Sequence, residues 1–238
     1  MSRFKVAATV AFVISAGFYF ATRSLADEEA NSNSLVSNDR LEVATFAGGC
    51  FWCMEPPFEK LSGVVGVVSG YTGGFKKNPT YQEVSHTETG HVEAVQVSYD
   101  PTKVSYDDLL NVFWRNVDPT DTGGQFVDRG SSYQSAIFYH NVSQRRSAEL
   151  SRDSLAASGR FDKPIVTPIR AASTFYRAEE YHQDYYKKNA LKYKYYRYQS
   201  GRDKFIDSVW GTPERLYSFN FIFITILGIA SVSFLGYM

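Results

Sequence analysis

The order in which strand and helix patterns follow one another constrains the fold of this chain more than any other feature. Runs rich in β-branched and aromatic residues, or with alternating apolar residues, predict strands, and amphipathic stretches between them predict helices. The strand patterns cover residues 43–46, 64–71, 91–99, 133–140 and 165–171, and the helix patterns cover residues 55–61, 105–115 and 143–158.

The resulting order, β-α-β-β-α-β-α-β, contains the split β-α-β pattern of ferredoxin-like folds. We therefore expect an α/β (α+β) fold: a two-layer ferredoxin-like βαββαβ sandwich with an additional strand, an additional helix and long coil segments. A chain of 238 residues can hold one substantial core of this kind, with too little left for a second full domain.

The N-terminal end differs in composition from this middle part. Arg3 and Lys5 precede an uncharged stretch, residues 6–22, and residues 24–26 supply small side chains at a plausible cleavage site. Residues 1–26 therefore predict a signal peptide or an N-terminal anchor. The two basic residues would stay in the cytoplasm, which places the catalytic domain outside it, in a periplasmic or lumenal compartment.

The C-terminal end is also apolar. Residues 217–238 contain no charged side chain, so we expect residues 212–238 to form a hydrophobic membrane anchor; the alternative is a C-terminal helix docked on the domain. The polar run at 27–40 predicts a linker, which leaves residues 41–211 as the folded domain. The chain is then membrane-associated through its ends.

The charge balance excludes a class of partner. Lys and Arg number 25, as do Asp and Glu, so no net field draws the chain to nucleic acid. We expect a monomer that acts on a small molecule or a polypeptide.

The two cysteines, Cys50 and Cys53, form a C-x-x-C motif after a short strand and close to a predicted helix start. We expect Pro56 and Pro57 in the first turn of that helix, where backbone N–H groups lack helical partners. The partial positive charge at a helix start favours the thiolate, which is the nucleophilic form.

Four interpretations of the cysteine pair compete. The pair could form a structural disulfide, or it could bind zinc together with His86 and His91. It could be the redox motif of a thioredoxin-like disulfide oxidoreductase. It could also belong to a cysteine enzyme that resolves its own oxidised intermediate.

Glu93 favours an enzyme. In the strand pattern at 91–99, it shares one face with Val95, Val97 and Tyr99, which is the apolar face. A carboxyl group in low dielectric is pushed toward its neutral form and becomes a proton donor near neutral pH. The alternative is that Glu93 lies at the edge of the strand and meets solvent or a lysine.

Five other residues could contribute to a site. Tyr81 and Tyr133 are possible phenol donors, and Phe51 and Trp52 flank Cys50 and could form an apolar wall. Each ring taken alone is more often part of the core than of a site. Asp128 is by default a turn residue, and the four histidines form no convincing metal-binding pair.

Taken together, these patterns resemble the peptide methionine sulfoxide reductase A family, in a variant with a Cys-Phe-Trp-Cys motif. The likeness runs through nearly all of residues 41–211. The matching segments are Gly49-Cys50-Phe51-Trp52 with Glu55, Gly-Tyr-Thr-Gly-Gly at 70–74, Pro-Thr-Tyr-Gln-Glu-Val at 79–84, Thr-Gly-His-Val-Glu-Ala-Val at 89–95, Asp-Arg-Gly-Ser-Ser-Tyr-Gln-Ser-Ala-Ile at 128–137, Phe175-Tyr176, Ala178-Glu179 and His182-Gln183.

The resemblance implies a peptide-methionine (S)-S-oxide reductase, acting on free or protein-bound methionine sulfoxide. Cys50 would attack the sulfoxide sulfur and become a sulfenic acid, while a neutral Glu93, with Tyr81 and Tyr133, would protonate the departing oxygen. It further implies no bound cofactor and no metal, with a thioredoxin or similar dithiol as reductant.

By the same resemblance, Phe51 and Trp52 would hold the substrate methyl group and Asp128 would support the polar network. The sequence departs from the commonest family pattern at Cys53, where a glycine is usual, and it lacks a resolving cysteine at 193–211. Cys53 is then the expected resolver, through a Cys50–Cys53 disulfide. Resolution by a glutathione-type thiol or by the donor protein is the alternative. Two other functions remain open, a thioredoxin-like disulfide oxidoreductase and a tethered binding protein without catalysis.

Overall fold

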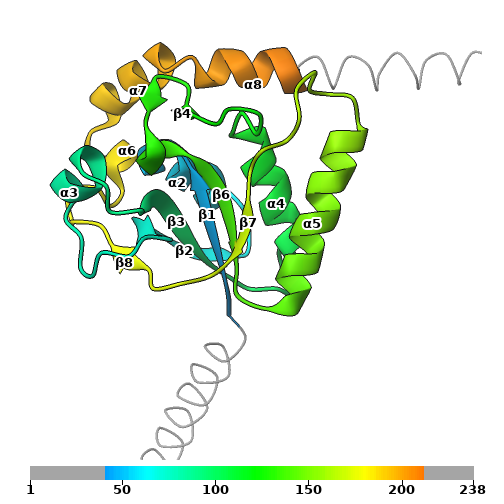
Figure 1. The fold of residues 1–238 in the computed structure, drawn as a ribbon, viewed down its shortest axis with the longest axis horizontal. Coiled ribbons are helices and arrows are strands. Elements are labelled where there is room, and N and C mark those ends of the chain that lie inside the picture. Colours follow the sequence, from blue (N-terminus) through cyan, green and yellow to red (C-terminus); the bar gives the residue numbers. More distant parts are fainter. Residues whose placement is uncertain (1–40, 212–238) are drawn as a thin grey trace, which may run out of the picture. The chain divides into compact units, whose positions relative to one another are not determined.

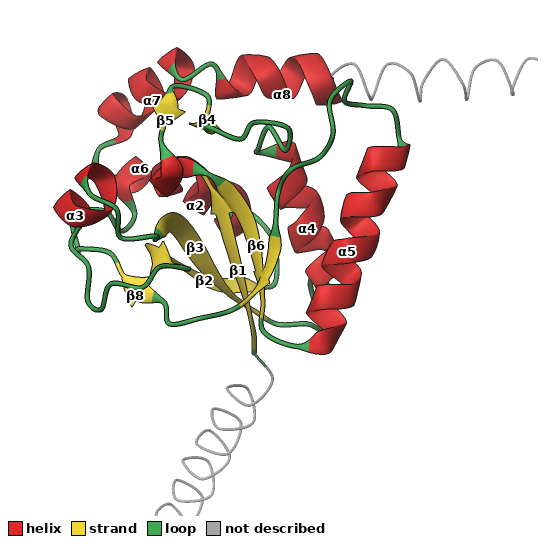
Figure 2. Ribbon diagram, in the orientation of Figure 1, coloured by secondary structure: helices red, strands yellow, loops and turns green. Residues whose placement is uncertain are grey.

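The fold of the chain is built on one mixed sheet with helices, as shown in Figures 1 and 2. The structure is a computed structural model that describes residues 41–211. The strands are β1 (Glu42–Gly48), β2 (Val64–Thr72), β3 (Val92–Tyr99), β4 (Gly124–Gln125), β5 (Asp128–Arg129), β6 (Ser135–Tyr139), β7 (Ile169–Ala171) and β8 (Tyr176–Arg177). The helices are α2 (Phe51–Glu59), α3 (Tyr81–His86), α4 (Tyr106–Arg115), the short 3₁₀ helix η1 (Ser131–Tyr133), α5 (Val142–Ala157), α6 (Tyr185–Lys188), α7 (Ala190–Gln199) and α8 (Arg202–Trp210).

The sheet has the strand order β7-β6-β1-β3-β2-β8, and β4 and β5 form a separate hairpin. Its four central strands therefore lie in the order fourth, first, third, second along the chain, as in a split β-α-β arrangement. β6 pairs with β1, and β2 with β3, in antiparallel register. The predicted α/β fold with a ferredoxin-like core is confirmed, and β7 and β8 extend its two edges.

The two faces of the sheet are covered differently. On one face Phe46 of β1 stacks on Phe58 of α2 at 5.1 Å and on Phe113 of α4 at 5.3 Å, measured between ring centroids. Residues of α5 join this main cluster. The other face carries a smaller cluster that includes Phe138, and coil residue Phe175 packs against it. Helices thus form one layer and long coil covers the opposite side, as the sequence predicts.

Local sequence explains where α4 begins. Ser105 precedes the helix, its hydroxyl accepts the N–H of Asp108 at 3.1 Å, and the Asp108 carboxylate accepts the N–H of Ser105 at 3.0 Å. This reciprocal capping box satisfies two N–H groups that have no helical partner. The predicted start of this helix is confirmed.

The start of α2 differs from the prediction. The helix begins at Phe51, four residues before the expected start, so Pro56 and Pro57 lie in its second turn. Pro57 has no N–H to donate to the carbonyl of Cys53. The guanidinium of Arg197 donates to that oxygen at 2.9 Å instead, so a side chain from α7 satisfies the group that the proline leaves free.

Two strands are shorter than expected. Tyr133 lies in the 3₁₀ helix η1, so β6 begins only at Ser135, and β7 begins at Ile169. Helices α3, α6, α7 and α8 were not predicted. α7 has no buried residue, which explains why its sequence shows no clear apolar stripe.

The predicted signal peptide or anchor at 1–26, the linker at 27–40 and the hydrophobic segment at 212–238 lie outside the described residues. Between residues 41 and 211, no helix has both the length and the apolar character needed to cross a bilayer.

Candidate active site

The two cysteines lie at the junction between β1 and α2. Cys50 occupies the N-cap position of α2, directly after Gly49, whose φ of +78° suits a residue without a side chain. A Cβ on Gly49 would also lie 2.6 Å from the Cβ of Gln125. Cys50 is 6% exposed and Cys53 is fully buried, and both are free thiols. The glycine turn thus aims Cys50 out of the strand while Cys53 faces the interior.

Seven of the eight predicted site residues line one cavity of about 150 Å³. Cys53 is the exception, because its side chain lies behind the turn and does not border the cavity. Tyr196 of α7 completes the lining and was not predicted. The lining residues are Cys50, Phe51, Trp52, Tyr81, Glu93, Asp128, Tyr133 and Tyr196.

Glu93 lies on the helix-covered face of β3, as its position in the apolar alternation predicts. Its Oε2 accepts a hydrogen bond from the backbone N–H of Phe51 at 3.0 Å, at the first residue of α2. Burial raises the pKa of Glu93 to about 8, the Phe51 hydrogen bond opposes that rise, and Asp128 and Cys53 add to it. Glu93 is therefore a protonated carboxyl group at neutral pH, bordering the same cavity as Cys50.

Tyr81 is the first residue of α3 and Tyr133 the last of η1, and their phenol groups interact through a hydrogen bond at the cavity. Burial raises the pKa of each phenol, and the nearby Glu93 adds to both rises. Both hydroxyl groups thus keep their protons and can donate hydrogen bonds into the cavity.

Trp52 is held in place by residues that follow the sheet in sequence. Its indole N–H donates to Nδ1 of His182 at 3.1 Å, and its ring stacks on Tyr185 at 3.7 Å between centroids. Burial lowers the pKa of His182 to about 4, so Nδ1 remains free to accept. The sequence alone does not indicate a partner for His182, and no local pattern connects it with Trp52.

Asp128 is the first residue of β5 and more than a turn residue. The hydroxyl of Tyr196 donates to its Oδ2 at 2.5 Å. Burial raises the pKa of Asp128, while this hydrogen bond and the charge of Arg202 oppose the rise. The run of tyrosines in 193–198 is visible in the sequence, but nothing there indicates that Tyr196 points inward.

The two thiols differ in acidity. Burial raises the pKa of Cys50 well above its ordinary value, and so does its hydrogen bond to Cys53. That same hydrogen bond lowers the pKa of Cys53 to about 6, against burial and with help from Arg202 and Arg197. The shared hydrogen bond thus favours the thiolate form of Cys53 over that of Cys50.

The histidines of the zinc interpretation are engaged elsewhere. Nδ1 of His91 accepts the N–H of Gly74 at 3.1 Å, and Nε2 lies 2.7 Å from the carbonyl oxygen of Lys76. His86 bonds within α3, to Ser85. Neither ring is directed at the cysteines.

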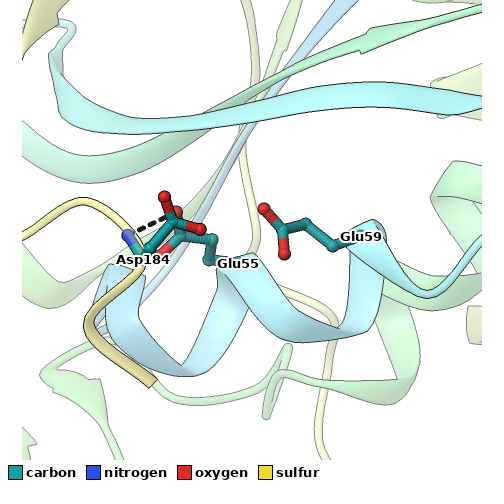
Figure 3. A group of neighbouring side chains, drawn as sticks. All are labelled: Glu55, Glu59 and Asp184. Atoms are coloured by element: carbon teal, nitrogen blue, oxygen red, sulfur yellow. Dashed lines mark hydrogen bonds between the residues drawn. The ribbon is translucent and has the colours of Figure 1, made fainter. Parts of the chain in front are cut away.

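One group of three carboxylates lies close together in the described part of the chain, formed by Glu55, Glu59 and Asp184 (Figure 3). Oε1 of Glu55 accepts the backbone N–H of Asp184 at 3.1 Å. The ammonium of Lys187 lies 2.7 Å from Glu59 and 2.7 Å from Asp184, so a side chain already supplies the positive charge. The group ties α2 to α6.

Comparison with known proteins gives a consistent set of relatives. The family model described as peptide methionine sulfoxide reductase matches residues 42–214. The peptide methionine sulfoxide reductase MsrA of Listeria innocua is 57% identical over 175 residues, covering 74% of this chain and 99% of that protein. The MsrA of Bacillus subtilis is 56% identical over 174 residues, covering 73% of this chain and 98% of that protein.

Solved structures with the same fold agree with these relatives. Mxr1 of Saccharomyces cerevisiae in its reduced form is 30% identical with a TM-score of 0.60, covering 64% of this chain and 87% of that one. Methionine sulfoxide reductase A of Corynebacterium diphtheriae is 34% identical with a TM-score of 0.55, covering 64% and 76%.

Proposed function

Because this chain belongs to the peptide methionine sulfoxide reductase family, we propose that it reduces the S epimer of methionine sulfoxide, free or in proteins, with Cys50 as the attacking thiol. One observation carries the proposal: Cys50 and the protonated Glu93 border the same cavity of about 150 Å³. A nucleophile and an acid on one small cavity are what transfer of the sulfoxide oxygen requires.

In the first step, the Cys50 sulfur attacks the sulfoxide sulfur and forms an S–S bond, while Glu93 protonates the oxygen and the phenols of Tyr81 and Tyr133 hydrogen-bond to it. The resulting hydroxyl group then passes to the Cys50 sulfur, and the S–S bond and the S–O bond to the substrate sulfur both break. The thiol and the sulfoxide together become a sulfenic acid on Cys50 and a thioether, so the sulfur of Cys50 is oxidised and that of the substrate reduced. Glu93 regains its proton from the one that Cys50 gives up.

Phe51 and Trp52 supply the apolar part of the site. Their rings border the cavity beside Cys50, and the orientation of Trp52 is fixed by its bond to His182. We propose that they receive the methyl group of the substrate, because an apolar wall next to the nucleophile orients the sulfur toward it. Asp128 accepts the hydroxyl of Tyr196, whose ring packs edge-on against Trp52 at 5.9 Å between centroids.

In the second step, Cys53 attacks the sulfenic acid and a Cys50–Cys53 disulfide forms. Support comes from the low pKa of Cys53, about 6, which supplies a thiolate next to Cys50. A thioredoxin-like dithiol then reopens the disulfide by thiol–disulfide exchange. The cycle uses two thiols and an external dithiol, with no bound cofactor.

The test is a single-turnover assay of the full chain with each sulfoxide epimer. The wild-type protein releases methionine from the S epimer, Cys50→Ser releases none, and Glu93→Gln releases it slowly because the amide cannot protonate oxygen. Full turnover by Cys50→Ser refutes the mechanism. Activity on disulfide substrates that does not depend on Glu93 points to a disulfide oxidoreductase instead.

A matched variant isolates the second step. Cys53→Ser still releases one methionine per protein molecule and then stalls until a small thiol is added, since attack precedes resolution. Repeated turnover of Cys53→Ser with thioredoxin alone contradicts Cys53 as the resolver.

We also propose that the catalytic domain is membrane-associated and faces away from the cytoplasm. The support is sequence pattern alone, namely the uncharged residues 6–22 behind Arg3 and Lys5, and the uncharged residues 217–238. Fractionation followed by protease protection tests this proposal. A catalytic domain that is degraded only when the protease is given access to the cytoplasmic side of the membrane refutes it.

A further inference from the structure

Arg202, the first residue of α8, is a fully buried cation. Its Nη2 donates to the carbonyl oxygen of Gly48 at 2.9 Å, and its Nη1 donates to the carbonyl oxygen of Asn116 and contacts Sδ of Met54 at 3.4 Å. The ring of Phe126 lies 4.6 Å from its Cζ. The guanidinium is thus enclosed by the chain that leads into Cys50 and by the helix that follows.

This buried charge forms no ion pair, and Asp128, the carboxyl group whose pKa it lowers, is hydrogen-bonded by Tyr196 instead. None of the ion pairs in residues 41–211 includes Arg202, and its Nε makes no hydrogen bond. A guanidinium stays charged in any protein, and a buried charge without a counter-ion is destabilising. An anion close to Arg202 would therefore be strongly favoured.

Arg197 provides the contrast. It also lies against the turn at residues 49–53 that carries both cysteines, here called the thiol turn. Its guanidinium donates to the carbonyl oxygen of Cys53 at 2.9 Å, but its charge is matched by Asp203 at 2.7 Å. The unmatched positive charge of this region is therefore that of Arg202, next to the turn at Gly49: a Cβ there would lie 3.2 Å from its Nη2.

The ionisable groups around Cys53 leave it as the best partner for that charge. Cys50 donates its S–H to Cys53, and Asp128 is already hydrogen-bonded by Tyr196. The remaining groups that act on the acidity of Cys53 are the two cations, whose charges lower its pKa. Glu93 and the phenols of Tyr193 and Tyr196 also interact with Cys53 and keep their protons near neutral pH. Burial raises the pKa of Glu93 to about 8, that of Tyr193 to about 12 and that of Tyr196 well above its ordinary value.

We propose that Arg202 is a positioning residue for the second step, holding the Cys53 sulfur as a thiolate ready to attack the sulfenic acid of Cys50. This inference rests on the proposed function. In the step, the Cys53 thiolate forms the S–S bond, the S–O bond of the sulfenic acid breaks, and the leaving hydroxide takes the proton of Glu93 and departs as water. Cys53 is oxidised, the sulfur of Cys50 is reduced, and Glu93 is reprotonated by solvent.

The experiment compares three variants of the full chain in single turnover. Arg202→Met removes the charge, and Arg202→Lys keeps it. Arg160→Met is the matched control. Arg160 also contacts α8, donating to the carbonyl oxygen of Val209 at 2.6 Å, but it contacts no residue of the thiol turn. Released methionine reports the first step, and loss of free thiols, trapped by a maleimide and counted by mass, reports the second, each between pH 6 and pH 10.

All variants should release the first methionine within about two-fold of wild type at pH 7. Disulfide formation should slow at pH 7 in Arg202→Met, about two-fold if the pKa of Cys53 rises to 7 and about ten-fold for each further unit, and recover toward pH 10. Arg202→Lys and Arg160→Met should follow wild type. A wild-type pH profile in Arg202→Met, or an equal loss in Arg160→Met, overturns the inference.

If Arg202→Met does not fold, Arg202→Gln takes its place, because its amide can still donate to a backbone carbonyl, and alkylation of Cys53 is compared between Cys50→Ser and Cys50→Ser with Arg202→Gln. A Cys53 thiol that becomes reactive at higher pH in the double variant supports the inference, and equal profiles overturn it. If the wild-type protein releases no methionine from the sulfoxide, the proposed function itself is wrong. Failure of the proposed function is thus distinguishable from failure of the inference about Arg202.

Discussion

Replacing Glu93 by Gln should flatten the pH dependence of folding. The amide keeps an oxygen that can accept the N–H of Phe51, now 3.0 Å from Oε2, and it has nearly the same shape as the carboxyl group. Only the titration is removed. Because Glu93 is 2% exposed, that titration is coupled strongly to folding.

The sign follows from the direction of the shift. The pKa of Glu93 goes from 4.5 in an ordinary environment to about 8 in the folded protein, so between these values the folded state holds a proton that the unfolded state has lost. Stability from this group is complete below pH 4.5 and is lost as the pH rises through about 8. The full loss corresponds to about 5 kcal/mol.

The assay is urea unfolding of wild type and Glu93→Gln at intervals from pH 5 to pH 8.5. The free energy of unfolding of the wild type should fall across this range by several kcal/mol more than that of the variant. Glu55, whose pKa burial raises to about 7, titrates in both proteins and cancels in the difference. Parallel pH dependences of the two proteins would refute a neutral, buried Glu93.

Three further predictions concern stability. Ser105→Ala removes the cap that accepts the N–H of Asp108 and should lower the free energy of unfolding by about 1 kcal/mol in urea. Phe46→Ala leaves a cavity in the main core and should cost about 3–5 kcal/mol, measured the same way, whereas Val142→Ala, at a side chain 81% exposed, should change little. Gly49→Ala should cost at least about 2 kcal/mol, because φ is +78° and the added Cβ meets a neighbouring side chain, and thermal unfolding would show it.

Local patterns predicted the parts of the fold that local interactions determine. The capping box of Ser105 and Asp108 marks α4 because both partners lie within one turn. The alternation around Glu93 placed its side chain on the helix-covered face because strand geometry has a period of two. The cavity residues, apart from Tyr196, were reached by adding the family resemblance to these patterns.

Long-range contacts decided what the sequence did not reveal. At the early start of α2, Glu93 accepts the N–H of Phe51 from 42 residues away, whereas Pro56 and Pro57 locally favour a later start. Arg202 is fully buried, but the residues around it in the sequence are like those around an exposed arginine. Its role is visible only once α8 is packed beside the thiol turn.

The two prolines of α2 also bear on the mechanics of the thiol turn. Because Pro56 and Pro57 have no N–H, the carbonyl groups of Trp52 and Cys53 are not bonded to the next helical turn. Residues three apart on a regular helix must move to form a disulfide. Here that movement breaks two backbone hydrogen bonds fewer than it would in an uninterrupted helix, and the bond that Arg197 makes to the carbonyl oxygen of Cys53 is a side-chain bond that can follow the moving turn.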